Sequence, residues 1–165
     1  MAVLVAAAGA ATGRLLIWPT QGMPARVNAI VMMDGPGKIL SRTLQLARQH
    51  RPQFLVISLG THESSYHCPR RIPDTRLICF NPKPASTAGE AEYVGRLARR
   101  YHWRSVALVT ITPQDTRARL RVERCFAGRV YVMTAPLDPS QTSWPYQIVY
   151  QWGALLKALI LQPSC

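Results

Sequence analysis

The chain has 165 residues, of which 48% are hydrophobic and 17% are charged. This length predicts one domain with its own core, and the composition excludes a disordered or fibrous protein. The basic residues are 17 arginines and 3 lysines, and the formal net charge is +12. Codon bias in a GC-rich genome also produces such an arginine excess beside many alanines and prolines. The charge therefore indicates an anionic partner without requiring a nucleic acid.

The first 18 residues form an apolar segment that Arg14 interrupts. Its length approaches that of a membrane-spanning helix, but an arginine inside such a helix is costly. A standard signal peptide has basic residues before its apolar region, but no basic residue precedes this run. An imperfect membrane anchor, a shortened signal segment and a frayed tail are the alternatives, and we expect some membrane association. Residues 19–26, with one glycine and two prolines, are expected to link this segment to a domain over 27–165.

Strand-like and helix-like segments alternate along residues 27–165. Short apolar runs predict five strands, over 27–33, 53–59, 76–80, 105–110 and 130–134. Apolar residues at helical spacing predict helices over 39–49, 87–101, 114–126 and 143–161, and 61–75 is expected to be a loop. Strands buried on both faces and alternating with helices predict an α/β fold. We expect a single Rossmann-like three-layer sandwich with a mainly parallel five-stranded sheet.

The four cysteines show no spacing typical of a zinc site, and no metal site is expected. Cys68 and Cys79 could pair across a short loop if the domain is exported, whereas in the cytosol they would be buried thiols. Both alternatives stay open. His62, His67 and His102 also lack ligand spacing, and surface positions are expected for them.

Polar residues concentrate where the predicted strands end. In open α/β sheets, ligands bind outside the carboxyl ends of the strands, at the switch in strand order. We therefore expect one pocket at this edge, with Asp34 and Glu90 as its catalytic carboxylates. The expected ligand-binding residues are Gly35, Gly37, Ser58, Gly60, Ser86, Thr87, Thr110, Gln114 and Arg117.

The turn after the first predicted strand, Asp34 to Gly37, resembles a glycine-rich phosphate loop. It lacks GxGxxG and GK[ST], so a standard dinucleotide or nucleoside triphosphate site is unsupported. A strand-to-helix turn that uses glycine for its backbone freedom is the structural alternative.

The segment PASTAGE at 84–90 is typical of a helix start. Ser86 or Thr87 can cap the helix, and Thr87 with Glu90 matches a capping box. In addition, free amides and the dipole at a helix N-terminus attract an anion, and Glu90 could act as a base or a metal ligand. The two interpretations can hold together.

Four arginines, at positions 117, 119, 121 and 124, fall on the helix predicted to begin near Pro113. Arg117 lies nearest the expected pocket, and its guanidinium suits bidentate binding of a phosphate or carboxylate. For the other three, a solvated basic face is the alternative.

Four blocks, each behind a predicted strand, resemble the YdcF-like/SanA-like (ElyC-like) family of α/β envelope-associated proteins. The blocks are AIVMMDGPG at 29–37, LVISLG at 55–60, PKPASTAGEAEYV at 82–94 and VALVTITPQDTRARL at 106–120. The resemblance implies a short N-terminal membrane segment, a link to cell-envelope biogenesis, and a nucleotide-like or S-adenosylmethionine-type ligand. By position, Thr87 and Glu90 match the family's Thr-and-Glu block, and Arg117 with Ala118 matches its Arg-Ala pair.

Three positions depart from the family pattern. Gln114 stands where the family usually has a histidine, Ile39 where it often has an arginine, and Asp34 where it often has a glycine. Glutamine cannot act as a general acid or base near neutral pH, whereas histidine can. A non-catalytic ligand-binding or scaffolding protein is therefore the alternative to an enzyme.

Together these features predict a protein of the plasma membrane or cell envelope, with a cytoplasmic location as the alternative. We expect it to bind an anionic, phosphorylated or nucleotide-like small molecule or a lipid-linked precursor. A hydrolase or transferase acting on a phosphoester or phosphoanhydride would fit the residues. No cofactor is identified. Nucleic-acid binding is a third alternative, but the chain lacks the aromatic-studded basic strand of single-strand readers.

Overall fold

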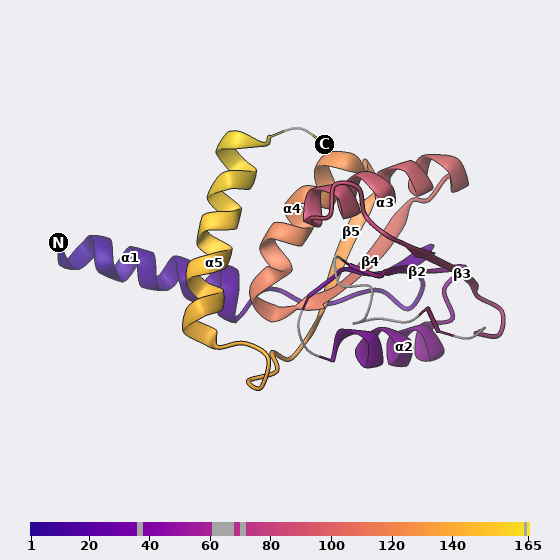
Figure 1. Ribbon diagram of the computed structural model, residues 1–165, viewed down its shortest axis with the longest axis horizontal. Helices are drawn as coiled ribbons and strands as arrows, with labels where there is room; N and C mark the ends of the chain where they lie inside the picture. Colours follow the sequence, from indigo (N-terminus) through magenta and orange to yellow (C-terminus); the bar gives the residue numbers. More distant parts are fainter. Residues whose placement is uncertain (36–37, 61–67, 70–71, 164) are drawn as a thin grey trace.

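A computed structural model describes residues 1–35, 38–60, 68–69, 72–163 and 165 (Figure 1). Five strands in this part of the chain form one sheet in the order β3-β2-β1-β4-β5, and every adjacent pair is parallel. The strands are β1 (Ala29–Met32), β2 (Phe54–Ser58), β3 (Arg76–Phe80), β4 (Ser105–Ile111) and β5 (Arg129–Ala135). The predicted Rossmann-like α/β sandwich is confirmed.

Helices cover both faces of this sheet. The helix α2 (Ile39–His50) packs on one face, and α3 (Thr87–Tyr101) and α4 (Asp115–Cys125) pack on the other (Figure 1). Side chains alternate between faces along a strand, so in β4 the residues Leu108 and Val109 join different cores. Leu108 packs with α3 and α4, whereas Val109 packs with α2. Two apolar layers therefore hold the sheet rigidly between helices.

The last helix stands outside these two layers. It comprises α5 (Trp144–Leu156), which continues as one π-helical turn, η3 (Lys157–Leu161). It packs against α4 and against η2 (Thr112–Gln114), the short 3₁₀ turn that follows β4. This contact puts α5 at the carboxyl end of the sheet, where the polar residues gather.

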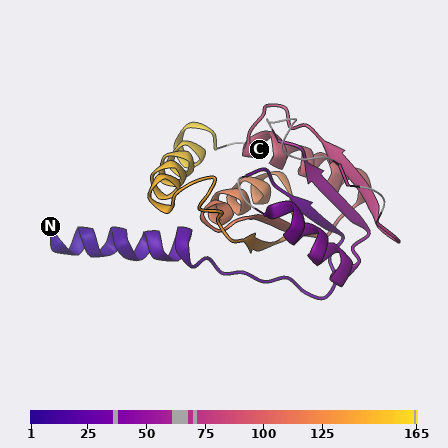
Figure 2. The same ribbon diagram turned by 60° about the horizontal axis from the view of Figure 1, so that its bottom comes forward.

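The N-terminal segment forms α1 (Ala2–Thr12) and a π-helical turn, η1 (Gly13–Ile17). Figure 2 shows α1 extending away from the body of the molecule. The C-terminal end of α1 contacts α5, because Trp152 of α5 donates its indole N–H to the Thr12 hydroxyl at 3.1 Å. No helix in the described ranges is both long and apolar enough to cross a membrane.

The expected linker, 19–26, lies in part along β5. The Gly22 amide donates to the Val132 carbonyl at 3.1 Å, and the Gln21 side chain accepts from the Thr134 amide at 3.1 Å. These contacts attach the N-terminal segment to the outer edge of the sheet.

The predicted elements agree with those of the structure except at their ends. The ranges predicted for β3 and α3 match, whereas β1 is shorter than the predicted 27–33 and the predicted helix 143–161 comprises α5 and η3. Hydrogen bonding at the ends of elements depends on neighbouring segments, so such differences are expected. Part of the predicted loop 61–75 lies outside the described residues, as do His62 and His67, while His102 is exposed as expected.

Two disulfide bonds are formed. Cys68 pairs with Cys79, which is the pairing alternative left open by the sequence. Cys125 at the end of α4 pairs with Cys165 near the C-terminus, 40 residues further along the chain. The sequence did not indicate this second bond.

Candidate functional site

The candidate site lies where the strand order reverses. β1 leads into α2 on one face, and its neighbour β4 leads through η2 into α4 on the other. Connections that diverge in this way open a crevice at the carboxyl ends of the two strands. A cavity of about 500 Å³ occupies this place. Its lining residues are Asp34, Gly35, Pro82, Ala85, Ser86, Thr87, Glu90, Ile111, Gln114, Arg117, Tyr146, Gln147, Tyr150 and Gln151.

Glu90, in the first turn of α3, supplies a buried carboxyl group to this cavity, and only 2% of the residue is exposed. The backbone amide of Asp34 donates a hydrogen bond to Glu90 Oε1 at 2.6 Å. Burial raises the pKa of the Glu90 carboxyl from 4.5 to about 7, against the lowering effects of the Asp34 amide and the nearby Ser58 hydroxyl. A carboxyl group with this pKa can both give and take a proton near neutral pH.

The beginning of α3 differs in detail from the predicted capping box. Ser86 is the N-cap, and its hydroxyl accepts from the Gly89 amide at 3.4 Å. Thr87 is the first helical residue, so it cannot cap the helix together with Glu90. The Glu90 carboxyl turns instead toward the end of β1, because it accepts the Asp34 amide. The sequence spacing TxxE therefore serves the cavity rather than a capping box.

Arg117, in the first turns of α4, is held in place from two helices. Its NH1 group donates to the Thr87 hydroxyl of α3 at 2.7 Å, and its Nε donates to Gln151 Oε1 of α5 at 2.9 Å. Burial lowers the pKa of the guanidinium, which the neighbouring Tyr150 and Glu90 oppose. A guanidinium has five N–H donors. These two bonds thus fix its plane and leave donors for an anion in the cavity.

Gln114 completes this polar group. It is 4% exposed, and its side-chain amide donates to the same Thr87 hydroxyl at 3.4 Å. Because Thr87 accepts from both Arg117 and Gln114, its own proton can be donated to a ligand. Gln114 therefore adds to the cavity a hydrogen-bonding amide, a group that cannot act as a general acid or base.

The helix α5 provides a wall of the cavity that the sequence analysis missed. Gln151 donates to Gln147 at 3.2 Å, and Gln147 donates to the Thr142 hydroxyl at 3.0 Å. Both glutamines are buried, although glutamine is usually exposed. The available signal was their i, i+4 spacing on an otherwise apolar helix, which puts two amides on one face.

Three further predicted residues lie beside the cavity without lining it. Gly60, two residues after β2, has a φ of +72°, a conformation that suits glycine, and a β-carbon there would overlap the Asp34 carboxylate. Ser58 and Thr110 are fully buried at the strand ends. Within the described part of the chain, the Thr110 hydroxyl reaches no hydrogen-bond partner, whereas the Ser58 hydroxyl lies close enough to Glu90 to lower the pKa of its carboxyl group. Gly37 lies outside the described residues.

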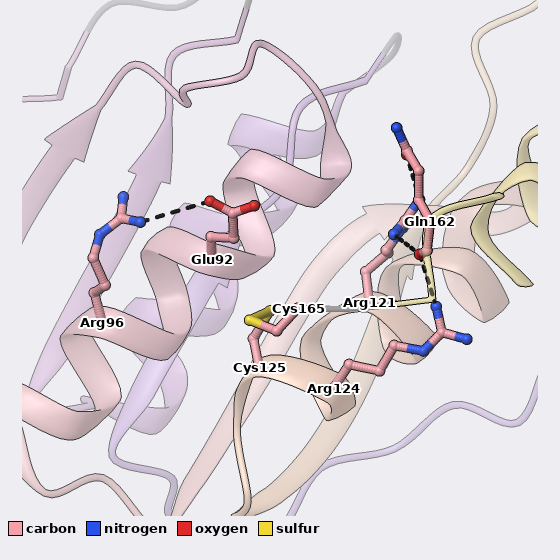
Figure 3. The surroundings of a disulfide bond; sticks show 7 residues. All are labelled: Glu92, Arg96, Arg121, Arg124, Cys125, Gln162 and Cys165. Atoms are coloured by element: carbon pink, nitrogen blue, oxygen red, sulfur yellow. Dashed lines mark hydrogen bonds and ion pairs between the residues drawn. A yellow bond between two sulfur atoms is a disulfide. The ribbon is translucent and has the colours of Figure 1, made fainter.

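Two of the remaining arginines of α4, Arg121 and Arg124, bind the C-terminal segment, and the third, Arg119, binds β5. Arg121 is 6% exposed, so the alternative that it belongs to a solvated basic face is wrong. Arg121 donates to the Gln162 carbonyl at 2.6 Å (Figure 3), and Arg124 donates to the Ala158 carbonyl at 2.7 Å. Cations near the last carbonyls of a helix satisfy acceptors that have no partner in the helix. Arg119 donates to the Val130 carbonyl at 3.1 Å.

The cavity combines a buried carboxyl group of raised pKa with a buried guanidinium group. Asp34 follows β1, Glu90 lies in the first turn of α3 and Arg117 lies in α4, and all three line the cavity. Helix N-termini and guanidinium groups both stabilise negative charge. Among the residues that the structure describes, no three His, Cys, Asp or Glu side chains are grouped so as to hold a metal ion.

Comparisons with known proteins give no match. No family model matches the chain, and neither the curated proteins nor the solved structures contain one that does.

Proposed function

We propose that this protein binds an anionic small molecule, phosphorylated or nucleotide-like, at the carboxyl edge of its sheet, and that it acts there as a hydrolase or transferase. One observation carries the proposal: Glu90, with its pKa raised to about 7, and Arg117, fixed by two hydrogen bonds, line the same cavity. Buried carboxyl groups with raised pKa values beside a cation are typical of sites that transfer protons.

Each group has a chemical part in this proposal. Arg117 and the amides at the start of α3 hold the anion, as a guanidinium and a helix N-terminus do for phosphate. The Thr87 hydroxyl orients it. Glu90 gives a proton to the leaving group or takes one from the attacking group, and Asp34 keeps Glu90 in place through its amide. Fixed charges of this kind stabilise the charge that develops at a phosphoryl group during transfer.

A ligand screen followed by one substitution tests this proposal. The full chain is incubated with inorganic phosphate, nucleotides, S-adenosylmethionine and polyprenyl phosphates, and its melting temperature is measured. An anion that binds the folded state raises this temperature. Turnover of the compound that binds is then compared between the protein and E90Q, with the exposed Glu123 changed to Gln as the matched control. Loss of turnover in E90Q alone supports the proposal, whereas no stabilisation by any compound contradicts it.

A second candidate function is a ligand-binding or scaffolding role without catalysis. It is favoured by Gln114, which supplies an amide at a position where proton transfer would need a histidine. The same substitution separates the two functions. A binding protein keeps its affinity and function in E90Q, while an enzyme keeps its affinity and loses turnover.

The resemblance to the YdcF-like/SanA-like family supports a further part of the proposal, an association with the cell envelope. The apolar α1, whose residues 2–10 are all exposed, is the segment that would contact a membrane. Fractionation of cells that express the full chain, with and without V3S and L4S, tests this part. Recovery of both forms in the soluble fraction would contradict it.

A nucleic-acid partner remains the third alternative, motivated by the net charge of +12. Binding to the phosphate backbone releases counterions, and it weakens steeply with added salt because salt reduces the free energy gained from this release. Titration of an oligonucleotide at about 50 mM and 200 mM salt, where phosphate-backbone binding differs by orders of magnitude, therefore distinguishes this alternative from a buried anion site.

A further inference from the structure

An exposed apolar face runs along α5 from the mouth of the cavity. Tyr146 and Tyr150 line the cavity and are 60% and 48% exposed. Val149, Leu156 and Ile160 are 74%, 49% and 70% exposed and follow on the same side of the helix at spacings of three, four and seven residues. We refer to these five residues as the α5 apolar face.

This face is unusual for a surface helix. Such a helix normally turns charged and polar residues outward and apolar residues toward the core. Here the inward side carries the two buried glutamines beside Leu155 and Ala158, and the outward side carries tyrosine, valine, leucine and isoleucine. Large exposed apolar patches mark binding surfaces. The inverted pattern therefore indicates that the outer side of α5 is covered when the protein functions.

We propose that the ligand of this site is a phosphorylated lipid, whose anionic head binds Arg117 while its apolar chain lies along the α5 apolar face. This inference rests on the proposed function and assigns its substrate class. It joins two observations, the anion-binding group inside the cavity and the apolar face that begins at its mouth.

Continuity and length favour a chain as the occupant. Tyr150 belongs to both surfaces, since the centre of its ring lies 5.8 Å from the Arg117 guanidinium and about half of the residue is exposed on α5. From Tyr146 to Ile160 the helix rises about 21 Å, which is far more than a phosphate or a nucleotide would cover. A single row of apolar side chains of this length suits one extended hydrocarbon chain.

Charge also favours this occupant. Lys157, which directly follows Leu156 of this face, is exposed and positively charged, so it attracts an anionic amphiphile. The net charge of +12 acts in the same direction. A partner helix of another protein would also fit the apolar face, but it would leave the anion-binding group in the cavity without a role.

Calorimetry with two soluble probes tests the proposal on the full chain. Butyl phosphate and dodecyl phosphate, the latter below its micelle concentration, carry the same head and differ only in chain length. Each half-buried methylene contributes about a twofold gain in affinity, and the two chains differ by eight methylenes, so dodecyl phosphate should bind about 250-fold more tightly than butyl phosphate. A twelve-carbon trimethylammonium salt serves as the control for the charge of the head.

The double variant V149S/I160S should reduce the gain from chain length to less than tenfold and leave the binding of butyl phosphate unchanged. Neither residue lines the cavity. The matched control is V3S/L4S, in which two exposed apolar residues of α1 are changed in the same way. It should keep the full gain. Circular dichroism establishes that both variants are folded.

Other outcomes would overturn the inference and are distinguishable from one another. Equal affinity for the two phosphates means that an anion site exists without a chain site, so the proposed function stands and this inference fails. Equal binding of the cationic amphiphile means that the face takes any detergent. Self-association that V149S/I160S abolishes, measured by analytical ultracentrifugation, means that a second copy covers the face. No binding of either phosphate contradicts the proposed function as well.

Discussion

The backbone amide of Asp34 donates a hydrogen bond to the carboxyl group of Glu90 at 2.6 Å, although the two residues lie 56 positions apart. This bond connects the end of the central strand β1 to the first turn of α3. It holds a carboxyl group that burial would otherwise make costly. The site thus depends on the packing of α3 against the sheet, and its protonation is coupled to folding.

The pH dependence of stability should report this coupling. The pKa of Glu90 is about 7 in the folded protein and about 4.5 in the unfolded chain, so between these values the folded state retains a proton that the unfolded chain releases. The contribution of Glu90 to the free energy of unfolding is therefore fully present below pH 4.5, falls as the pH rises toward 7, and then levels off. The loss amounts to about 3 kcal/mol at most.

Urea unfolding of the protein and of E90Q between pH 5 and pH 8 measures this effect. An amide does not titrate, so E90Q should show a flatter profile and should be more stable than the protein at pH 8. Asp115, whose pKa burial raises to about 6, adds a similar slope at lower pH that E90Q retains. Parallel profiles for the two proteins would contradict the assigned environment of Glu90.

Removal of the Arg117 guanidinium should weaken anion binding. Charge-assisted hydrogen bonds contribute about 1.5–3 kcal/mol, so R117Q should bind phosphate or a phosphoester at least tenfold more weakly. R117K should restore little of this affinity, because an ammonium group cannot donate to Thr87, Gln151 and a ligand in one plane. Calorimetric titration measures the affinities, and R99Q on the exposed side of α3 is the control. Unchanged affinity in R117Q would exclude Arg117 as the anion-binding group.

The sequence alone was sufficient for the fold and for one side of the site. Short apolar runs rich in β-branched residues, such as 105–110, are typical of strands buried on both faces, and the order of such strands and helices leaves few topologies. The rule that ligands bind at the carboxyl ends of parallel strands then predicted the positions of Asp34, Glu90 and Arg117, which all line the cavity.

The side formed by α5 could not be predicted in the same way. This helix follows the edge strand β5, away from the switch in strand order, so the rule does not lead to it. Its position against η2 is set by tertiary contacts, among them the bond between Gln151 and Arg117. The pairing of Cys125 with Cys165 was equally out of reach, because it depends on how η3 packs against α4.

Two glycine substitutions should have opposite effects. G60A introduces a β-carbon that overlaps the Asp34 carboxylate at a φ of +72°, so it should destabilise the protein by about 1–2 kcal/mol or more and weaken ligand binding. G153A places its β-carbon in open space on α5. It should stabilise the protein by about 0.5–1 kcal/mol, because alanine favours a helix. Urea unfolding of both variants at one pH measures the difference, and equal effects would contradict the crowding at Gly60.

Loss of the disulfide between Cys125 and Cys165 should loosen α5 and with it the site. The bond closes a loop of 40 residues that contains β5 and all of α5. The chain-entropy relation gives a stabilisation of about 4 kcal/mol for such a loop. The hydrogen bonds from Arg121 and Arg124 to the segment that ends at Gln162 hold the same region (Figure 3), so C165S should remain folded.

We expect C165S to melt at a lower temperature and to bind phosphate more weakly, because Gln151 then fixes Arg117 less firmly. C79S opens the other disulfide, on β3, and serves as the control. Hydrogen exchange should show faster exchange in α5 for C165S than for C79S, and equal rates in α5 would mean that the C-terminal bond does not position this helix.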